Sequence, residues 1–315
     1  MRRFIVLFLV LLFLTACLGC ANGLEKKENT VEKNSYAVQD YRGKSISFEG
    51  KPQRIVSLFV YGDEVLLGLV DHKRIAGLSK WVHDADLSMG YEDAKDVPQI
   101  AENNPEAILA LKPDLVLMPS GSKPEQIGAL EDLGIKVFVY PAASSLKNIS
   151  VTIKYMGDAV GERKQAEKLI SDMQQRISVI EAKTKKMRLQ DKKKALLFLR
   201  FGAVGGRGII FNDIMTAAGI EDCYEFGRSN YFEQDGKTRI LSKEEVVQAN
   251  PDYLLLGSWS QGGVYKTGKE QLAEIYADPA LATITAVKKK QVIMIPQRYV
   301  HCLSQHAADS VELLH

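Results

Sequence analysis

The sequence predicts an α/β protein with two doubly wound lobes, each built around a central parallel sheet, and one long linker helix joining them. Two observations lead to this prediction. Short, continuous apolar runs alternate with helical patterns along the chain, which is typical of the buried strands of parallel sheets. In addition, residues 106–120 and 244–258 match without a gap at five of fifteen positions, so the two halves share one plan.

The first 16 residues have the pattern of an export signal. Arg2 and Arg3 precede eleven uninterrupted apolar residues, Phe4 to Leu14. A charged start and a short apolar stretch describe a secretory signal peptide, and the stretch is short for a membrane span. We therefore expect residues 1–16 to form a removable signal peptide, with an uncleaved signal anchor as the alternative.

The next residues predict a lipid anchor followed by a tether. Leu14-Thr15-Ala16-Cys17 resembles the lipobox of bacterial lipoproteins, in which the Cys thiol is acylated with diacylglycerol, so Cys17 is the expected lipidation site. Cys20 is a weaker second candidate. Residues 17–35 contain little to bury and should form a flexible, solvated tether. We expect the protein to sit on the extracytoplasmic face of the cell membrane, held there by lipid alone.

Composition excludes several classes of protein. The chain has 315 residues, of which 46% are hydrophobic and 25% charged, as in ordinary globular proteins. It has 41 Lys and Arg against 39 Asp and Glu, and loss of Arg2 and Arg3 with the signal would leave it close to neutral. A nucleic-acid partner that binds through an excess of basic residues is therefore not expected.

The remaining chain divides into an N-terminal lobe at 36–145, a helical linker at 146–189 and a C-terminal lobe at 190–315. In the linker, one helical stretch ends near Gly161 and a second runs from about 163 to 187. In the lobes, the expected strands are 55–58, 115–118, 137–140, 195–201, 253–256 and 291–295, and the expected helices include 63–70 and 212–218.

Each copy of the repeat reads as a helix that feeds a buried strand. Asn104 before Pro105 starts the first helix, and Ser242 followed three residues later by Glu245 starts the second; both are N-cap patterns. Pro113-Asp114 and Pro251-Asp252 then end the helices before the apolar runs begin.

Together these features resemble the periplasmic-binding-protein superfamily, in the class that serves importers of iron-siderophore complexes, haem and cobalamin. The motifs that carry the resemblance are 52–58 (PQRIVSL), 111–116 (LKPDLV), 133–137 (LGIKV) and the Glu-bearing helix of the second lobe. The resemblance implies a ligand cleft between two lobes, no catalytic activity and no cofactor. It implies a small-molecule metal chelate as ligand and an ABC-importer permease dimer as partner, and we expect a monomer.

The resemblance also implies a docking device. In this class, an acidic residue near a helix start in each lobe pairs with Arg on the permease, and the matching positions are Glu106 and Glu244. The alternative is that each Glu only stabilises its own helix dipole, an effect of about 0.3–1 kcal/mol. Because the same residue recurs at the same helical position in both halves, we favour docking.

Candidate ligand-binding residues follow the strands, because ligands of α/β sheets lie outside the carboxyl ends of the strands. Aromatic faces suit flat or greasy chelates, and Arg suits carboxylates or an anionic ferric complex. Both tryptophans could instead pack locally, and Tyr299 and His301 could merely cap the final strand. The candidates are Tyr61, Trp81, Ser120, Arg200, Arg207, Trp259, Arg298, Tyr299 and His301.

Other motifs do not support competing functions. The glycines at 202–208 lack dinucleotide-loop spacing because Phe211 stands where the third glycine belongs. Residues 257–262 are out of step with a nucleophile elbow. His301, Cys302 and His306 match no common zinc pattern, so no metal site is expected. Five histidines, none paired across the halves, argue against a receptor for free zinc or manganese.

We therefore expect a lipoprotein that captures an iron-siderophore-type chelate, with cobalamin or haem as the alternative ligand and a secreted α/β enzyme as a less favoured reading. Export permits a disulfide between Cys223 and Cys302 but nothing requires one. The sequence stops at His315, within what this class usually completes as a terminal helix, so we expect Asp309–His315 to be less well packed.

Overall fold

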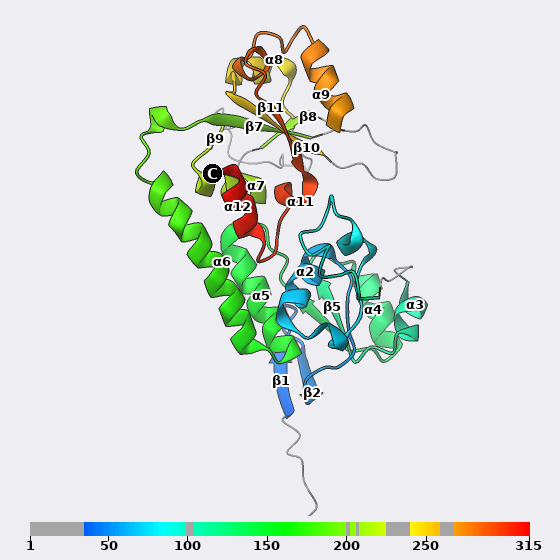
Figure 1. The fold of residues 1–315 in the computed structure, drawn as a ribbon. Helices are drawn as coiled ribbons and strands as arrows, with labels where there is room; N and C mark the ends of the chain where they lie inside the picture. Colours follow the sequence, from blue (N-terminus) through cyan, green and yellow to red (C-terminus); the bar gives the residue numbers. More distant parts are fainter. Residues whose placement is uncertain (1–34, 99–103, 200–201, 206–207, 225–239, 259–267) are drawn as a thin grey trace, which may run out of the picture. The chain divides into compact units, whose positions relative to one another are not determined.

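The structure, a computed structural model, describes residues 35–98, 104–199, 202–205, 208–224, 240–258 and 268–315 (Figure 1). The expected signal peptide, Cys17 and Cys20 lie outside the described residues. No helix within these ranges is both long and apolar enough to cross a membrane.

A four-stranded parallel sheet forms the centre of the N-terminal half. Its strand order is β4-β3-β5-β6, from β3 (Ile55–Ser57), β4 (Ile75–Gly77), β5 (Leu115–Pro119) and β6 (Val137–Tyr140). Alternate residues of these strands enter two different hydrophobic clusters: Ile55 and Leu117 join one, Val56 and Val116 the other. The sheet is therefore covered on both faces, which explains why its strands are continuous apolar runs.

Helices and 3-10 turns connect the strands of this half. They are α2 (Val60–Leu69), a 3-10 turn η1 (His72–Arg74), a second turn η2 (Lys80–His83), α3 (Pro105–Ala110) and α4 (Pro124–Asp132). Two of them, α2 and α3, correspond to predicted helices. Before them, β1 (Ser35–Gln39) and β2 (Ser45–Glu49) form an antiparallel hairpin that the sequence analysis did not anticipate. The hairpin contacts the linker, where the Tyr36 hydroxyl donates to the carbonyl of Ala159 at 2.9 Å.

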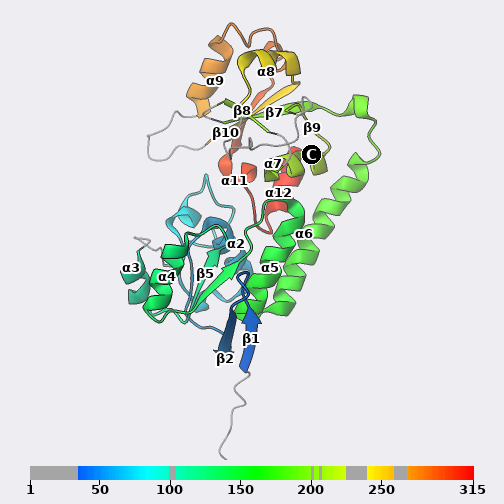
Figure 2. The ribbon, with the colours of Figure 1, turned by 180° about the vertical axis from the view of Figure 1, so that it is seen from behind.

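Two helices, α5 (Leu146–Val160) and α6 (Arg163–Thr184), form the linker and lie side by side (Figures 1 and 2). Gly161 ends α5 in the left-handed conformation, at φ 72°, which glycine adopts without steric cost. Thr184 ends α6 three residues before the expected end, and at 1.5 Å per residue its 22 residues span about 33 Å.

A second sheet forms the centre of the C-terminal half, with strand order β11-β10-β7-β8 and β9 paired to β7. Its strands are β7 (Lys194–Leu199), β8 (Gly202–Val204), β9 (Glu221–Asp222), β10 (Tyr253–Ser258) and β11 (Val292–Pro296). Among the described strands of this sheet, β10, β11, β7 and β9 pair in parallel, as expected, and only the β7–β8 pair is antiparallel. The two copies of the repeat supply β5 and β10 and so lie in separate sheets.

The helices of this half are α7 (Ile210–Ala218), α8 (Lys243–Ala249), α9 (Gly268–Ala277), α10 (Thr285–Lys288), α11 (Gln297–Val300) and α12 (Ala307–Leu314). The expectation that residues 309–315 pack poorly is wrong for the inner face of α12. Ser310 and Val311 are fully buried there because α12 packs against α6 and α7, whereas Leu313 is 53% exposed. Cys223 and Cys302 are both buried and free.

Candidate functional site

The predicted ligand residues that the structure describes all follow a strand at its carboxyl end. Tyr61 lies in the first turn of α2, just after β3, and Trp81 lies in η2, just after β4. Arg298 and Tyr299 lie in α11, and His301 caps that helix directly after β11. Ser120 follows β5, where its hydroxyl accepts from the amide of Ala142 at 3.1 Å. Arg200, Arg207 and Trp259 lie outside the described residues.

An exposed aromatic residue that the sequence analysis missed stands beside Tyr61. Phe59 is the N-cap residue of α2, its side chain is 47% exposed, and its ring centroid lies 5.9 Å from that of Tyr61. Because Phe59 continues the apolar run of β3, the sequence gives no reason to place it outside the core. The pair offers an aromatic surface at the carboxyl end of the first sheet.

Neutral polar groups and cations accompany these aromatic rings. Burial, opposed by no favourable charge, raises the pKa of Tyr61, so its phenol stays protonated. Burial lowers the pKa of His301 and favours the neutral imidazole. Lys80 Nζ lies 4.5 Å from the Trp81 ring centroid, a favourable cation–π arrangement. The aromatic rings could stack on a flat ligand and the neutral polar groups could hydrogen-bond to it. Arg298 adds a positive charge that could pair with an anionic group.

Residues Ser79–Gly90, which we call the 79–90 segment, carry Trp81 and are held by two buried carboxylates of α2. Asp63 accepts from the amide and the hydroxyl of Ser79, at 3.1 and 2.5 Å. Glu64 accepts from the Ser88 hydroxyl at 2.7 Å and the Met89 amide at 2.8 Å. No local sequence pattern marks these acids as anchors, because their serine partners are remote along the chain.

The carboxylate of Asp63 is fully buried, and desolvation raises its pKa well above the usual value. The two hydrogen bonds from Ser79 oppose this shift without cancelling it. Three oxygens in this region lack a hydrogen-bond partner in the structure, namely Asp63 Oδ1, Ser57 Oγ and the Tyr140 hydroxyl. Such groups raise the cost of burial.

The segment that follows β11 returns to the first half of the chain. The Arg298 amide donates to the carbonyl of Asp86 at 2.8 Å, and its guanidinium donates to the carbonyl of Ala85. Farther along, the Ser304 hydroxyl donates to Glu64 and the Gln305 amide group donates to the Glu64 carbonyl at 2.8 Å. The structure thus brings Arg298 to the segment that carries Trp81.

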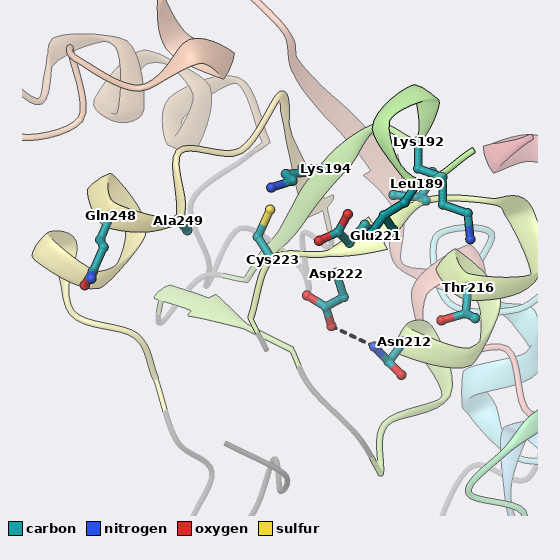
Figure 3. A pocket seen from close by; sticks show the side chains of 11 residues that line it. Leu189, Lys192, Lys194, Asn212, Thr216, Glu221, Asp222, Cys223, Gln248 and Ala249 are labelled. Atoms are coloured by element: carbon teal, nitrogen blue, oxygen red, sulfur yellow. Dashed lines mark hydrogen bonds between the residues drawn. The ribbon is translucent and has the colours of Figure 1, made fainter. Parts of the chain in front are cut away.

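Two of the cavities among the described residues lie away from these side chains. One of about 410 Å³ is lined by side chains from β7, α7, β9 and α8, including Lys194 and Asn212, and by Cys223, which follows β9 (Figure 3). Lys194 begins β7 and Glu221 begins β9, so this cavity lies at the amino ends of the strands, opposite the predicted ligand edge. Another of about 430 Å³ lies between α5, α6 and α7. Neither contains a predicted ligand residue.

The described residues contain no group of three or more His, Cys, Asp or Glu side chains able to hold a metal ion. His306, one of the histidines weighed as a ligand, instead pairs with Asp309, with 3.0 Å between Nδ1 and Oδ2. Burial raises the pKa of the Cys302 thiol, so it stays protonated.

The two candidate docking residues occupy equivalent positions. Glu106 is the second residue of α3, capped by the Asn104 side chain, and Glu244 is the second residue of α8, capped by Ser242. Both side chains are exposed. Glu245, the next residue, completes a capping box with Ser242 and so has a structural role that Glu244 lacks.

Comparison with known proteins agrees with this architecture. The chain is 25% identical over 250 residues, 75% of each chain, to the uncharacterized ABC transporter substrate-binding lipoprotein YvrC of Bacillus subtilis (strain 168). It is 24% identical over 269 residues to the iron(3+)-hydroxamate-binding protein YxeB of the same organism, covering 83% of this chain and 79% of that one.

A solved structure shares the fold. The periplasmic heme-binding protein RhuT from Roseiflexus sp. RS-1, in its apo form, superposes with a TM-score of 0.67 at 21% identity, covering 83% of this chain and 96% of that one. The model of the family described as periplasmic binding protein matches residues 55–299. These relatives are binding proteins and not enzymes. The chain is therefore a binding protein that belongs to the periplasmic binding protein family.

Proposed function

We propose that the protein captures an iron-siderophore-type chelate outside the cell and delivers it to the permease of an ABC importer. The observation that carries this proposal is the set of aromatic and cationic side chains at the carboxyl ends of strands in both sheets: Phe59, Tyr61 and Trp81 in the first half, Arg298 and Tyr299 in the second. Similarity to an iron(3+)-hydroxamate-binding protein supports the ligand class.

The ligand would lie between the two halves, gripped by both sets of side chains. Aromatic faces pack on the organic part of a chelate, and a guanidinium pairs with its anionic oxygens. Binding would need no covalent chemistry, which suits a protein that must release its ligand unchanged. Capture at the extracytoplasmic face of the cell membrane would rely on acylated Cys17, and the name of the relative YvrC, a lipoprotein, supports this anchoring.

Ligand titration tests the proposal. The full chain, with Trp259 replaced by Phe so that Trp81 is the remaining tryptophan, would be titrated with several ferric hydroxamate and catecholate siderophores, cobalamin and haem. We expect at least one ferric siderophore to quench Trp81 with a dissociation constant of about 1 μM or lower, equivalent to about 8 kcal/mol.

A matched Trp81→Phe variant, with Trp259 retained, shows whether Trp81 touches the ligand; its affinity should fall several-fold, measured by calorimetry. Binding of cobalamin or haem alone would place the protein with the alternative ligands. No binding to any member of the panel, together with binding of a nucleotide, would contradict the proposal.

A further inference from the structure

The 79–90 segment is held at three points, which differ in how firmly they are built. Asp63 holds its start at Ser79, and Glu64 holds its end at Ser88 and Met89. Its middle is held by Arg298, from the helix that follows the last strand of the second sheet. Trp81 lies between the points held by Asp63 and Glu64, and its carbonyl accepts from the Asp84 amide at 3.2 Å.

The two outer points are fixed anchors. Asp63 and Glu64 are consecutive residues of α2, exposed by 0% and 2%, and their partners Ser79 and Ser88 are also buried. Glu64 is further saturated by the Ser304 hydroxyl. Separating a buried carboxylate from its donors breaks several hydrogen bonds at once and leaves buried polar groups without partners, which is energetically costly.

The middle point is different because it lies near solvent and the guanidinium there donates to a neutral backbone carbonyl, beside the bond from the Arg298 amide to Asp86. Arg298 is only partly buried and Ala85 is exposed. The guanidinium donates to a carbonyl, although its strongest partners are carboxylates and other anions. This contact is therefore the weakest of the three and the one most readily released.

We propose that Arg298 is a positioning residue, which clamps the middle of the 79–90 segment and thereby couples the second half of the chain to the orientation of Trp81. An effect of the clamp on ligand binding rests on the proposed function, in which Trp81 contacts the ligand. The clamp itself is a property of the protein without ligand, and it is tested in that form.

Amide hydrogen exchange of the full chain measures the clamp. The amides of Leu87 and Ser88 both donate to the Asp84 carbonyl at 3.0 Å, so their exchange reports opening of the middle of the segment. Since a hydrogen bond contributes about 0.5–1.5 kcal/mol, Arg298→Ala should raise their exchange rates about two- to tenfold. The Met89 amide, held by Glu64, should stay unchanged.

Two further variants make the measurement specific. Arg298→Lys keeps one donor and should show an intermediate rate. Arg188→Ala removes an equally charged side chain, one that donates to Asp191 in η3 (Leu189–Asp191), and should match the wild type. In the Trp259→Phe background, Arg298→Ala should also make Trp81 easier to quench with acrylamide.

Three outcomes would overturn the proposal. One is wild-type exchange at Leu87 and Ser88 in Arg298→Ala. Another is a rise spread over α2 and β3, which would mean general destabilisation. The third is that wild type and Arg298→Ala exchange at the same rate in about 1 M salt, where the Debye length is about 3 Å. Charge attraction between Arg298 and Asp84 or Asp86, and not the hydrogen bond, would then explain the effect at low salt. No ligand is involved, so these outcomes are independent of whether the chelate titration succeeds.

Discussion

At the scale of single residues, the packing of Tyr140 against Gly62 is an unusual contact in the first half. A Cβ added to Gly62 would lie 2.3 Å from the Tyr140 hydroxyl oxygen and 3.1 Å from Ser57 Oγ. Glycine is therefore required at position 62 because a side chain would clash with Tyr140, and not because the backbone makes a turn there. The hydroxyl gains no hydrogen-bond partner in the structure, and burial raises its pKa.

Two substitutions and their combination test this contact. Gly62→Ala should lower the free energy of unfolding by about 1–3 kcal/mol because the new methyl overpacks the site. Tyr140→Phe should be neutral or stabilising by up to about 1 kcal/mol, since it removes a buried unpaired hydroxyl. In the double variant, Tyr140→Phe should restore part of the loss, because the ring carbon at 3.0 Å still crowds the methyl.

Urea denaturation measures these changes, with Gly128→Ala as the matched control. Gly128 lies within α4 with open space around it, so alanine there should stabilise by about 0.5–1 kcal/mol. A marked loss of stability in Tyr140→Phe would contradict the prediction, because it would show that the hydroxyl makes a stabilising hydrogen bond.

The same scale shows what the sequence could not reveal. Asp63 and Glu64 look like the polar face of a surface helix, yet both are buried. Their partners Ser79, Ser88 and Ser304 are 16, 24 and 240 residues away, so no local pattern marks them. The candidate ligand positions were accessible to sequence reasoning because they follow strands, a rule that depends on local order.

At the scale of elements, the repeat has a physical reason. Lys112 and Asn250 occupy matching positions in the left-handed conformation, with φ of 49° and 44°, and each ends its helix before Pro-Asp. The next Asp then accepts from the start of the neighbouring strand: Asp114 from the Arg54 amide at 2.9 Å, Asp252 from the Lys194 amide at 3.0 Å. This shared function explains why Pro-Asp was a reliable marker of both central strands.

The terminal helix α12 is fixed by charge as well as by packing. Arg176 of α6 pairs with Asp309 and Glu312, and His306 pairs with Asp309. Burial alone would lower the pKa of His306, but the hydrogen bond that its ring N–H donates to Asp309, together with nearby carboxylates, outweighs burial and raises the pKa above the usual 6.5. The folded protein therefore holds this proton more tightly than the unfolded chain does.

This linkage predicts a pH dependence of stability. Because the folded-state pKa is raised, the contribution of His306 is fully present below about pH 6.5 and is lost as pH rises through the higher folded value. His306→Gln should remove that step, so the difference in melting temperature between wild type and variant should shrink from about pH 5.5 to 8. The exposed His72→Gln is the control, and a constant difference across this range would refute the linkage.

At the scale of the whole molecule, one hydrophobic cluster runs through residues of both sheets. It includes Leu117 of β5, Ile177 of α6, Leu197 of β7 and Val311 of α12. The two halves and the linker therefore share a core, which makes relative movement costly. The sequence predicted two sheets and a long helix from periodicity and the repeat, but contacts from the 297–306 segment to α2 depend on tertiary packing that periodicity does not encode.

The paired exposure of Glu106 and Glu244 gives a prediction about the complete protein at its transporter. Each is an exposed second residue of a helix that feeds a central strand, and each helix start is capped by another residue, Asn104 or Ser242. Removing both carboxylates should therefore leave folding and ligand affinity nearly unchanged, apart from helix-dipole terms of about 0.3–1 kcal/mol each. If the carboxylates pair with cationic residues of the permease, uptake should be abolished.

The measurement is uptake of the bound chelate by cells that express Glu106→Ala with Glu244→Ala, alongside affinity for the same chelate in solution. Glu245→Ala is the matched control, because it removes the neighbouring carboxylate and weakens a capping box by about 0.5–2 kcal/mol without altering the proposed contact. Loss of uptake in the double variant with normal uptake in the control locates docking at these two helix starts. Normal uptake in the double variant would show instead that the two acids serve only their own helices.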